Sequence, residues 1–588
     1  MTRSATFFAE YILKAFDAYH ETFTEITERS GRRFRNGDWH GIRNDAVERL
    51  ELYSRMVDQS VSELIGLIGD QRNDETQWEA VKAAFVESIQ DRYHYQLAET
   101  FYNSVIRRVF SVIGVNPRIE FTVSDFKIPL IEEKPCPICS AYPAKPGKTD
   151  IYSAVDGILN GFEKNLPLMD RPGDCRRVAR AIENHLEGKS LLAPDIHIEM
   201  ADPVFYRYKG AYLVGRILAG NEICPLILCI LNIEGKIFVD AVLFETHEVS
   251  ILFSFANAYF HVNVINPEEM VNFLKSIMPQ KRVSEIYTSL GYHKHGKAEL
   301  FREITRSLDQ TDDRFEITPG EKGMVMLVFT IPALNVVFKM IRDRFDFPKK
   351  TTHDHIRNRY QLVFRHDRAG RLVDAQEFYL LELDKKRFPE DLLEEINKKA
   401  SKNITVNTDH IIIRHLYTER RLTPLDIYIR ENPPEAVKEV LLDYGWAVKE
   451  LAASNIFPGD LFFKNFGVTQ WGRVVFYDYD ELSLLTDCRF RKMPEPRNHE
   501  EIMSDEPWFS VNENDVFPEE FRKFLYFPEH VRPAFEEIHG DLFGIHFWQE
   551  MQKKLKAGIM VHILPYKNYR RFDHKILESS GLYFSQKN

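Results

Sequence analysis

The stretch Ile456-Phe-Pro-Gly-Asp460-Leu-Phe-Phe-Lys-Asn465-Phe-Gly467 contains the spacing Asp-Leu-x-x-x-Asn. This spacing is the core of the protein-kinase catalytic loop, in which the aspartate orients the acceptor hydroxyl and the asparagine reaches a magnesium ion. Apolar residues at helical spacing over 437–453 predict a helix directly before it. We therefore expect Asp460 to be catalytic and Asn465 to bind Mg²⁺.

A second aspartate follows where a kinase places its other metal ligand. Asp478-Tyr-Asp480 begins thirteen residues after Asn465, beyond a predicted strand over 472–477. In kinases the aspartate at this position holds magnesium against the nucleotide phosphates. We predict that Asp478 binds the metal, and the sequence leaves the role of Asp480 open.

Upstream, a glycine turn and a lysine in an apolar run occur in the order that a nucleotide clamp requires. Candidate strands over 314–318 and 324–330 flank the turn 319–323, and Lys339 lies inside a third candidate strand, 335–341. Glycines let backbone N–H groups approach phosphates, and a lysine supplies positive charge to them. Taken separately, an ordinary hairpin and an outward-facing edge lysine are the alternatives. Together with the catalytic loop, these features predict a phosphate-binding clamp.

The pattern departs from that of most kinases in several places. Pro458-Gly459 replaces the usual His-Arg, the glycine turn has two glycines rather than three, and Asp-Tyr-Asp replaces Asp-Phe-Gly. The helix expected over 353–366 contains no glutamate for Lys339, which then pairs with phosphate alone or with another acid. A pseudokinase that binds nucleotide without turnover therefore stays an alternative. The acids that could substitute are Asp354, Asp374 and Glu377.

The first half of the chain has a different character. Residues 1–115 show helical periodicity, whereas 195–265 contains short β-rich runs and a hairpin turn at 232–236. Residues 116–150 are rich in loop-forming residues, and 307–314 is short and polar. No reaction motif occurs before this polar segment, so a regulatory or substrate-docking role is expected there.

We therefore predict an α+β chain of two domains. Residues 1–312 form a mostly helical regulatory domain with a small embedded β-sheet, and residues 313–588 form a protein-kinase-like, bilobal catalytic domain. The length of 588 residues exceeds what one hydrophobic core supports. A hydrophobic fraction of 44% and a charged fraction of 28% are ordinary for a soluble globular protein.

Charge and hydropathy exclude other classes of function. The net charge of -11 argues against a general nucleic-acid binder, which usually carries a basic domain or stripe. The amphipathic N-terminal segment lacks the continuous apolar region of a signal peptide, and no run approaches the roughly 18 apolar residues of a membrane span. We expect a cytoplasmic protein with no membrane or nucleic-acid partner.

One pair of cysteines has zinc-ligand spacing. Cys136 and Cys139 form a Cys-x-x-Cys motif, but no second such motif supplies the other two ligands of a structural zinc site. We predict a proline-bearing surface turn. Completion of a metal site by a distant residue such as Cys175 or Cys224 stays open.

Together with the departures from the usual kinase motifs, the sequence resembles the bacterial isocitrate dehydrogenase kinase/phosphatase family over its whole length. The resemblance is carried by residues 413–421, 452–469, 472–481 and 515–522. It implies phosphorylation of isocitrate dehydrogenase on a serine with ATP and Mg²⁺, and removal of that phosphate with ADP or ATP bound. This switches carbon between the citric acid cycle and the glyoxylate bypass. The family also implies AMP as an effector.

The resemblance also implies site residues. Nucleotide contacts would come from Lys339 and from the turn, and Asp374 would be a further active-site aspartate. From the residues alone, Asp374 reads equally well as a helix-terminal or strand-start aspartate. The turn residues are Thr318, Pro319, Gly320, Glu321, Lys322, Gly323 and Met324.

Alternatives to this function remain. A kinase-like phosphotransferase acting on a small molecule has the same catalytic motifs, since these motifs do not identify the acceptor. The sequence contains one phosphotransfer constellation and no Cys-x5-Arg phosphatase loop. If one chain carries out both reactions, we expect them to share a single nucleotide site.

Overall fold

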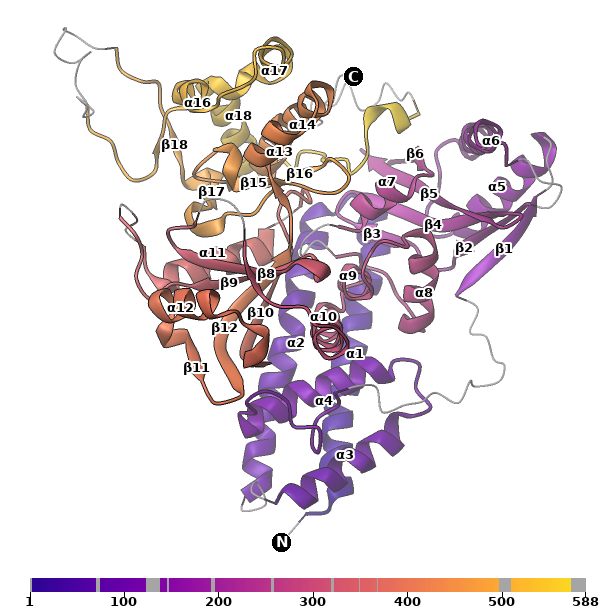
Figure 1. The fold of residues 1–588 in the computed structure, drawn as a ribbon. Helices are drawn as coiled ribbons and strands as arrows, with labels where there is room; N and C mark the ends of the chain where they lie inside the picture. The colour runs from indigo at the N-terminus through magenta and orange to yellow at the C-terminus, as the bar shows by residue number, and fades with distance from the viewer. Residues whose placement is uncertain are drawn as a thin grey trace.

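The structure is a computed structural model of the chain. It describes residues 3–69, 74–122, 138–144, 148–191, 196–254, 259–318, 322–347, 349, 351–366, 368–495 and 509–572. In Figure 1 the N-terminal helices form the lower part of the molecule, a six-stranded sheet lies to the right, and the C-terminal half lies to the left and above. Among the described helices, none has both the length and the apolar character needed to cross a membrane.

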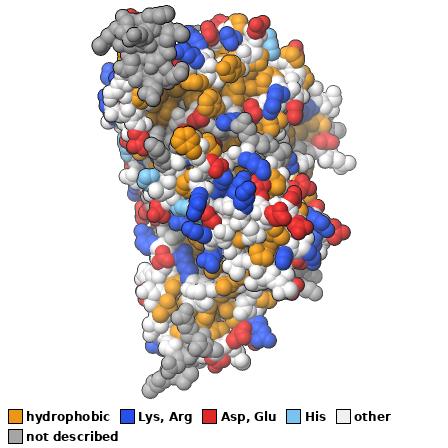
Figure 2. Space-filling model, turned by 60° about the vertical axis from the view of Figure 1, so that its left-hand side comes forward, with side chains coloured by type: hydrophobic (Ala, Val, Ile, Leu, Met, Phe, Trp, Pro, Cys, Tyr) orange, Lys and Arg blue, Asp and Glu red, His pale blue; other side chains and the backbone are white. Residues whose placement is uncertain are grey.

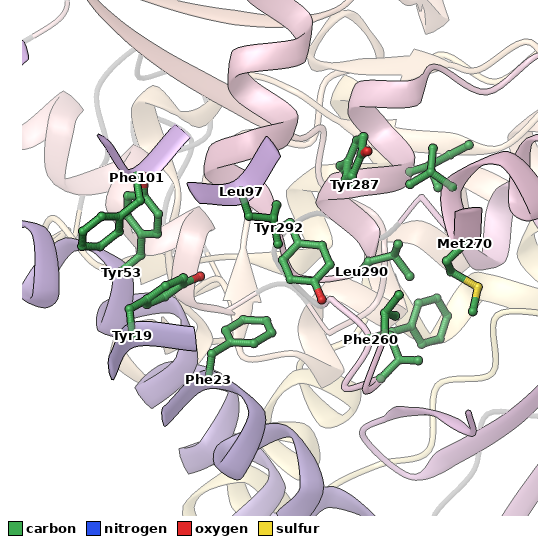
Figure 3. Packing of buried hydrophobic residues seen from close by; sticks show 14 of the residues in the cluster. Tyr19, Phe23, Tyr53, Leu97, Phe101, Phe260, Met270, Tyr287, Leu290 and Tyr292 are labelled. Atoms are coloured by element: carbon green, nitrogen blue, oxygen red, sulfur yellow. The ribbon is translucent and has the colours of Figure 1, made fainter. Parts of the chain in front are cut away.

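Four helices build the N-terminal region, which confirms the helical periodicity of its sequence. They are α1 (Ala5–Asn36), α2 (Trp39–Ile68), α3 (Glu75–Ile89) and α4 (Tyr95–Phe110). Aromatic side chains at helical spacing meet in their core: Tyr19 packs edge-on against Tyr53 at 5.2 Å and stacks on Phe101 (Figure 3). This core continues through Phe23 and Tyr292 into the next part of the regulatory half.

The sheet of the first half is antiparallel and ordered β1-β2-β4-β5-β6, with β3 paired to β4. The inner strand β5 is covered on both faces, because Ile227 and Leu231 join the helical core while Leu228 and Ile230 pack under α5 and α6. The predicted hairpin turn is confirmed. The strands are β1 (Cys139–Ala144), β2 (Ile196–Ala201), β3 (Phe205–Arg207), β4 (Gly210–Ala219), β5 (Glu222–Ile233) and β6 (Lys236–Leu243), and the covering helices are α5 (Lys148–Phe162) and α6 (Arg171–Gly188).

One expectation for this half is corrected. The segment expected to be a loop around Cys139 includes strand β1, in which Cys139 pairs with Ala201. Cys136 lies outside the described residues, and within the described ranges no group of three or more His, Cys, Asp or Glu residues could hold a metal ion.

Short helices connect the two halves of the chain. They are α7 (Thr246–Leu252), α8 (Pro267–Ile277), α9 (Val283–Ser289) and α10 (His293–Gln310). Helix α10 includes the beginning of the polar segment predicted as a boundary and ends at Gln310, after which the chain enters the second half.

The second half begins with an antiparallel sheet ordered β10-β12-β9-β8-β7, with β11 paired to β12. The predicted strands are confirmed, although the first of them is only two residues long. The elements are β7 (Glu316–Ile317), β8 (Met326–Ile331), β9 (Val336–Ile341), β10 (Ala375–Asp384), β11 (Ile404–Val406) and β12 (His410–Arg420), with helices α11 (His353–His366) and α12 (Glu390–Lys399).

A mostly helical lobe follows and completes the bilobal arrangement. Its core surrounds α14 and contains the buried Tyr444, Phe466 and Trp548. The helices are α13 (Leu425–Glu431), α14 (Pro434–Ala453), α16 (Pro518–Phe524), α17 (Arg532–His539) and α18 (Ile545–Lys556). The strands are β13 (Thr423–Pro424), β14 (Ile456–Phe457), β15 (Phe466–Val468), β16 (Val474–Phe476), β17 (Ser483–Leu484), β18 (Arg489–Phe490) and β19 (Asp515–Val516). The predicted α+β class is confirmed.

The C-terminal segment returns to the first half of the chain. Arg571 pairs with Asp240 of β6 at 3.0 Å, and the Tyr566 hydroxyl donates to the same carboxylate at 2.9 Å. Arg570 pairs with Glu248 of α7 at 2.7 Å. The end of the second half therefore packs against the sheet of the first half. Residues from both halves of the chain thus contribute to this part of the structure.

The surface mixes charges of both signs. On the face shown in Figure 2, both basic and acidic side chains occur, and several Lys and Arg side chains lie close together near the middle of the view.

Candidate active site

Lys339 lies in the middle of β9 and forms a buried ion pair. Its ammonium lies 2.8 Å from the Glu419 carboxylate of β12, and the side chains are 8% and 2% exposed. The ammonium also donates to the Tyr477 carbonyl at 2.9 Å. The buried ammonium of Lys339 therefore has both a charge partner and a hydrogen bond, which offset the cost of removing it from water.

Glu419 is the functional residue that sequence reasoning missed. Of the three acids considered for Lys339, Asp354 is 86% exposed and pairs with Arg357, and Glu377 pairs with His415 at 2.7 Å. A signal was present, because Glu419 is the single acidic residue of strand His410–Arg420, as Lys339 is the single charged residue of β9.

The described part of the glycine turn is held by its neighbours. The Thr318 hydroxyl donates to the Val328 carbonyl at 2.9 Å, and the Arg342 guanidinium donates to the carbonyls of Gly323 and Met324 at 2.8 and 3.0 Å. Lys322 is 60% exposed and pairs with Glu395 of α12. Its ammonium therefore lies against α12 in this structure. Three further turn residues, Pro319, Gly320 and Glu321, lie outside the described residues.

The catalytic-loop segment is fixed from both sides. Gly459 has a φ of 84°, and a Cβ there would lie 2.5 Å from the Glu481 carbonyl, so this position requires glycine. The buried Tyr444 hydroxyl of α14 donates to the Leu461 carbonyl at 2.7 Å. The Phe462 backbone N–H donates to Asp460 at 2.8 Å. Burial raises the pKa of the Asp460 carboxyl, and the neighbouring Asn465 amide opposes that shift.

A hairpin brings the two predicted metal ligands together. Strands β15 and β16 pair with Phe466 opposite Phe476, so Asn465 immediately before and Asp478 shortly after them lie at the same end. The Tyr477 N–H donates to the Asn465 carbonyl at 3.2 Å. Because Lys339 contacts the carbonyl of the same tyrosine, the lysine and the hairpin end share one site.

The donor set suits a divalent cation. The pKa of Asp478 is raised to about 7, chiefly by burial and then by the carboxylates of Asp480 and Asp460, although Lys339 and Lys349 oppose the shift. Buried carboxylates that repel one another are stabilised by a bound cation, and Mg²⁺ prefers carboxylate and carbonyl oxygens. Asn465 and Asp478 would hold the ion.

Asp480 has a separate position. Its carboxylate pairs with Lys349 at 2.9 Å, and Glu481 pairs with the same lysine. The hydroxyl of Tyr479, the residue before Asp480, donates to the Val373 carbonyl at 2.7 Å. These contacts fix the Asp-Tyr-Asp segment, in which the usual flexible glycine is replaced by a paired aspartate.

Asp374 lies beside the regulatory half. It immediately precedes β10, and its carboxylate accepts from the Gln376 amide at 2.9 Å. It lines a pocket of about 140 Å³ between the two halves. Burial lowers the pKa of Lys281 in that pocket, and the carboxylates of Glu285 and Asp374 oppose the shift. The structure thus groups Asp374 with the interdomain pocket.

The same pocket carries charged and aromatic side chains from both halves. Lys281, Arg282 and Glu285 come from the first half, whereas Arg420 and Trp471 come from the second. Glu419 also lines it, so the partner of Lys339 lies between this pocket and the lysine. Within the pocket, Glu285 pairs with both Lys281 and Arg420 at 3.7 Å, so one carboxylate joins cations of the two halves.

Comparison with known proteins gives matches over nearly the whole chain. Residues 313–568 match the family model "Isocitrate dehydrogenase kinase/phosphatase (AceK) kinase domain", and residues 9–312 match the regulatory domain of the same family. A kinase domain implies use of a nucleotide.

Relatives that share this name cover most of the chain. The isocitrate dehydrogenase kinase/phosphatase of Anaeromyxobacter sp. (strain Fw109-5) is 43% identical over 566 residues, which are 96% of this chain and 98% of that protein. The protein of the same name from Yersinia pseudotuberculosis serotype I (strain IP32953) is 39% identical over 571 residues, or 97% of this chain and 98% of the relative. The chain therefore belongs to the isocitrate dehydrogenase kinase/phosphatase family.

Proposed function

We propose that this protein phosphorylates isocitrate dehydrogenase on a serine with ATP and also removes that phosphate, at one nucleotide site. The proposal rests on the gathering of Lys339, Asp460, Asn465 and Asp478 around a single hairpin end. The relatives named for both activities match 96% and 97% of the chain. Residues 1–312 act as the regulatory domain and residues 313–588 as the catalytic domain.

Each side chain has a distinct task in phosphoryl transfer. Asp460 takes the serine proton while the serine oxygen bonds to the γ-phosphorus and the bond to the ADP oxygen breaks. Lys339 and the turn 318–324 bind the nucleotide phosphates. Bound Mg²⁺ would neutralise developing negative charge on the phosphate oxygens. Asn465 and Asp478 are its proposed ligands.

In the opposite direction a water replaces the serine hydroxyl as the acceptor. We propose that dephosphorylation also needs bound ADP or ATP, and that Asp374 or Asp460 positions this water. The position of Asp374 beside the interdomain pocket links this reaction to regulation.

The decisive experiment follows phosphate in both directions. The protein is incubated with γ-labelled ATP, Mg²⁺ and isocitrate dehydrogenase, and label is sought on a serine of the dehydrogenase. The labelled product is then purified and returned to the protein with ADP and Mg²⁺. Label that appears only on a small molecule would favour a small-molecule kinase, and no transfer with intact nucleotide binding would indicate a pseudokinase.

Asp478→Asn should separate metal use from nucleotide binding. The change removes one charged ligand of Mg²⁺ and, in metal-free buffer, one buried carboxylate that repels the phosphates. Turnover should fall by about a hundredfold or more, as for loss of one contact to transition-state charge. Nucleotide affinity without metal should be equal or tighter. Asp487→Asn, at an exposed position nearby, serves as the control. Equal losses in both measurements would contradict metal ligation by Asp478.

We propose that the interdomain pocket binds AMP as an effector. Trp471 offers a face for an adenine ring, and Lys281, Arg282 and Arg420 offer charge to a phosphate. The pocket is formed by the segments around α9 and β12 together with the turn that carries Trp471.

Trp471→Leu should weaken the response to AMP. Loss of base stacking costs about 1–3 kcal/mol per base, which corresponds to roughly tenfold or more in the AMP concentration that gives half of the effect. Kinase activity without AMP should stay close to that of the unaltered protein. Tyr93→Leu replaces an exposed aromatic residue of the regulatory half and is the matched control. An unchanged AMP response would place the effector elsewhere.

A further inference from the structure

We propose that Glu419 is a positioning residue for Lys339 and that Tyr360 of α11 in turn holds Glu419. Most kinases obtain the acid for this lysine from the helix that follows the lysine strand. Here the acid comes from strand β12, and the helix contributes a tyrosine hydroxyl. The inference rests on the proposed function and adds two residues to its machinery.

Strand register explains why Glu419 reaches the lysine. In the antiparallel pair β9–β12, Lys339 lies opposite Tyr417 and Glu419 lies opposite Val337. Lys339 and Glu419 are therefore diagonal neighbours on the same face of the sheet, within reach of long side chains. Their charged groups meet at 2.8 Å in a nearly water-free environment.

The second carboxylate oxygen of Glu419 faces helix α11. The Tyr360 hydroxyl donates to it at 3.4 Å, while Lys339 contacts the other oxygen. Tyr360 is itself fixed, since its ring stacks on Tyr417 at 3.8 Å and meets Tyr479 edge-on at 5.2 Å. Helix α11 is thus linked to Lys339 indirectly, because its Tyr360 contacts Glu419 and Glu419 contacts the lysine.

Tyr479 connects this arrangement to the predicted metal-binding segment. Tyr479 belongs to the Asp-Tyr-Asp motif. Two residues before it, the backbone carbonyl of Tyr477 accepts the hydrogen bond of Lys339. A shift of α11 would therefore move Tyr360 against Glu419 and against the motif together. Rigid aromatic packing makes such a relay specific, because each ring contacts the next.

Removing the charge of Glu419 leaves the Lys339 ammonium buried without its carboxylate partner, with the Tyr477 carbonyl at 2.9 Å and the rings of Tyr477 and Tyr479 at 5.2 and 5.9 Å still beside it. An ammonium in this state loses its fixed direction toward the phosphates, because the charge-assisted bond that aligned it is gone. The substitution changes the charge behind the phosphate-binding lysine and removes no group proposed to contact the nucleotide ring. ATP binding and transfer should suffer, and adenosine binding should not.

The test uses the full-length protein with Glu419→Gln, Tyr360→Phe, the double variant and Glu377→Gln. Glu377 is the matched control, since it is a partly buried carboxylate on the neighbouring strand β10 that pairs with His415 instead. Four quantities are measured: Kd for ATP, Kd for adenosine, kcat and KM for transfer to isocitrate dehydrogenase, and the melting temperature.

For Glu419→Gln we expect ATP affinity to fall about tenfold and kcat to fall at least as much, with adenosine affinity within about twofold of the original. Tyr360→Phe should cost about threefold in kcat alone and nothing further in the Glu419→Gln background, since residues acting in series are non-additive. Glu377→Gln should match the unaltered protein.

Several results would overturn the proposal. Equal losses of ATP and adenosine affinity would show a merely structural role for Glu419. Additive effects of the two substitutions would remove Tyr360 from the relay, and a Glu377→Gln variant as impaired as Glu419→Gln would make the effect non-specific. If the unaltered protein binds ATP but transfers no phosphate to the dehydrogenase, the proposed function fails, and the two affinity measurements still decide the role of Glu419.

Discussion

Lys339→Met should abolish phosphorylation and dephosphorylation of isocitrate dehydrogenase together. The ammonium of Lys339 is the buried charge directed at the site that Asn465 and Asp478 share, and methionine, of similar length, removes that charge together with its bonds to Glu419 and the Tyr477 carbonyl. Losing one contact to developing charge commonly costs about a hundredfold or more in rate. Because one nucleotide site is proposed for both directions, both rates should fall by at least this factor.

The measurement requires folded protein and both assays. The substitution also leaves Glu419 buried without its cation, so the melting temperature is recorded beside the two rates. Lys386→Met, at an exposed position paired with Asp384, provides the control for loss of a lysine in the same lobe. A Lys339→Met protein that is inactive as a kinase but fully active as a phosphatase without nucleotide would show a second, separate site.

The parts of the site that are local in sequence were predictable. Asp460 and Asn465 occupy one short loop, and their spacing alone indicated a shared chemistry. The helix over 437–453 and the strand before Asp478 were confirmed as α14 and β16, because their apolar periodicity reflects burial in one core. The roles assigned to these residues stay predictions until they are tested.

The partner of Lys339 could not be found in this way. Glu419 comes from a strand that is distant in sequence, and only the register of β9 against β12 places the two on the same face. Periodicity shows which face of a strand is buried but not which strand lies beside it. The acids near the expected helix were considered instead, and Asp354 proved to be exposed.

Features formed by both halves of the chain were equally hidden. The interdomain pocket combines Lys281 with Trp471, and the C-terminal Arg571 pairs with Asp240. In the sequence, the charged residues among them look like ordinary surface residues, because most charged side chains are exposed. Trp471 likewise has no local pattern that marks a binding site. Their function follows from tertiary packing, which a single sequence does not show. Strand β1 was missed because Pro143 within it and further prolines beside it favoured a loop.

Arg371→Met should destabilise the protein by about 3–5 kcal/mol, the usual cost of breaking a buried ion pair by removing one partner. Arg371 is 0% exposed and donates to Asp443 at 2.6 and 2.9 Å, to Glu450 at 2.6 Å and to the Val474 carbonyl at 2.8 Å. These contacts join α14 to β16, the two elements that flank the catalytic loop. The substitution leaves the Asp443 and Glu450 carboxylates without their main cation.

Urea unfolding of the full-length protein measures the effect through the transition midpoint, with Arg430→Met as control. Arg430 forms an exposed pair with Asp426 four residues away, and such pairs contribute roughly 0.3–0.5 kcal/mol. Adding Asp443→Leu and Glu450→Met to Arg371→Met should restore much of the lost stability, because a buried ionic cluster replaced by apolar side chains of similar volume is often neutral or stabilising. If the triple variant were less stable than Arg371→Met alone, the loss would come from packing and not from stranded charge.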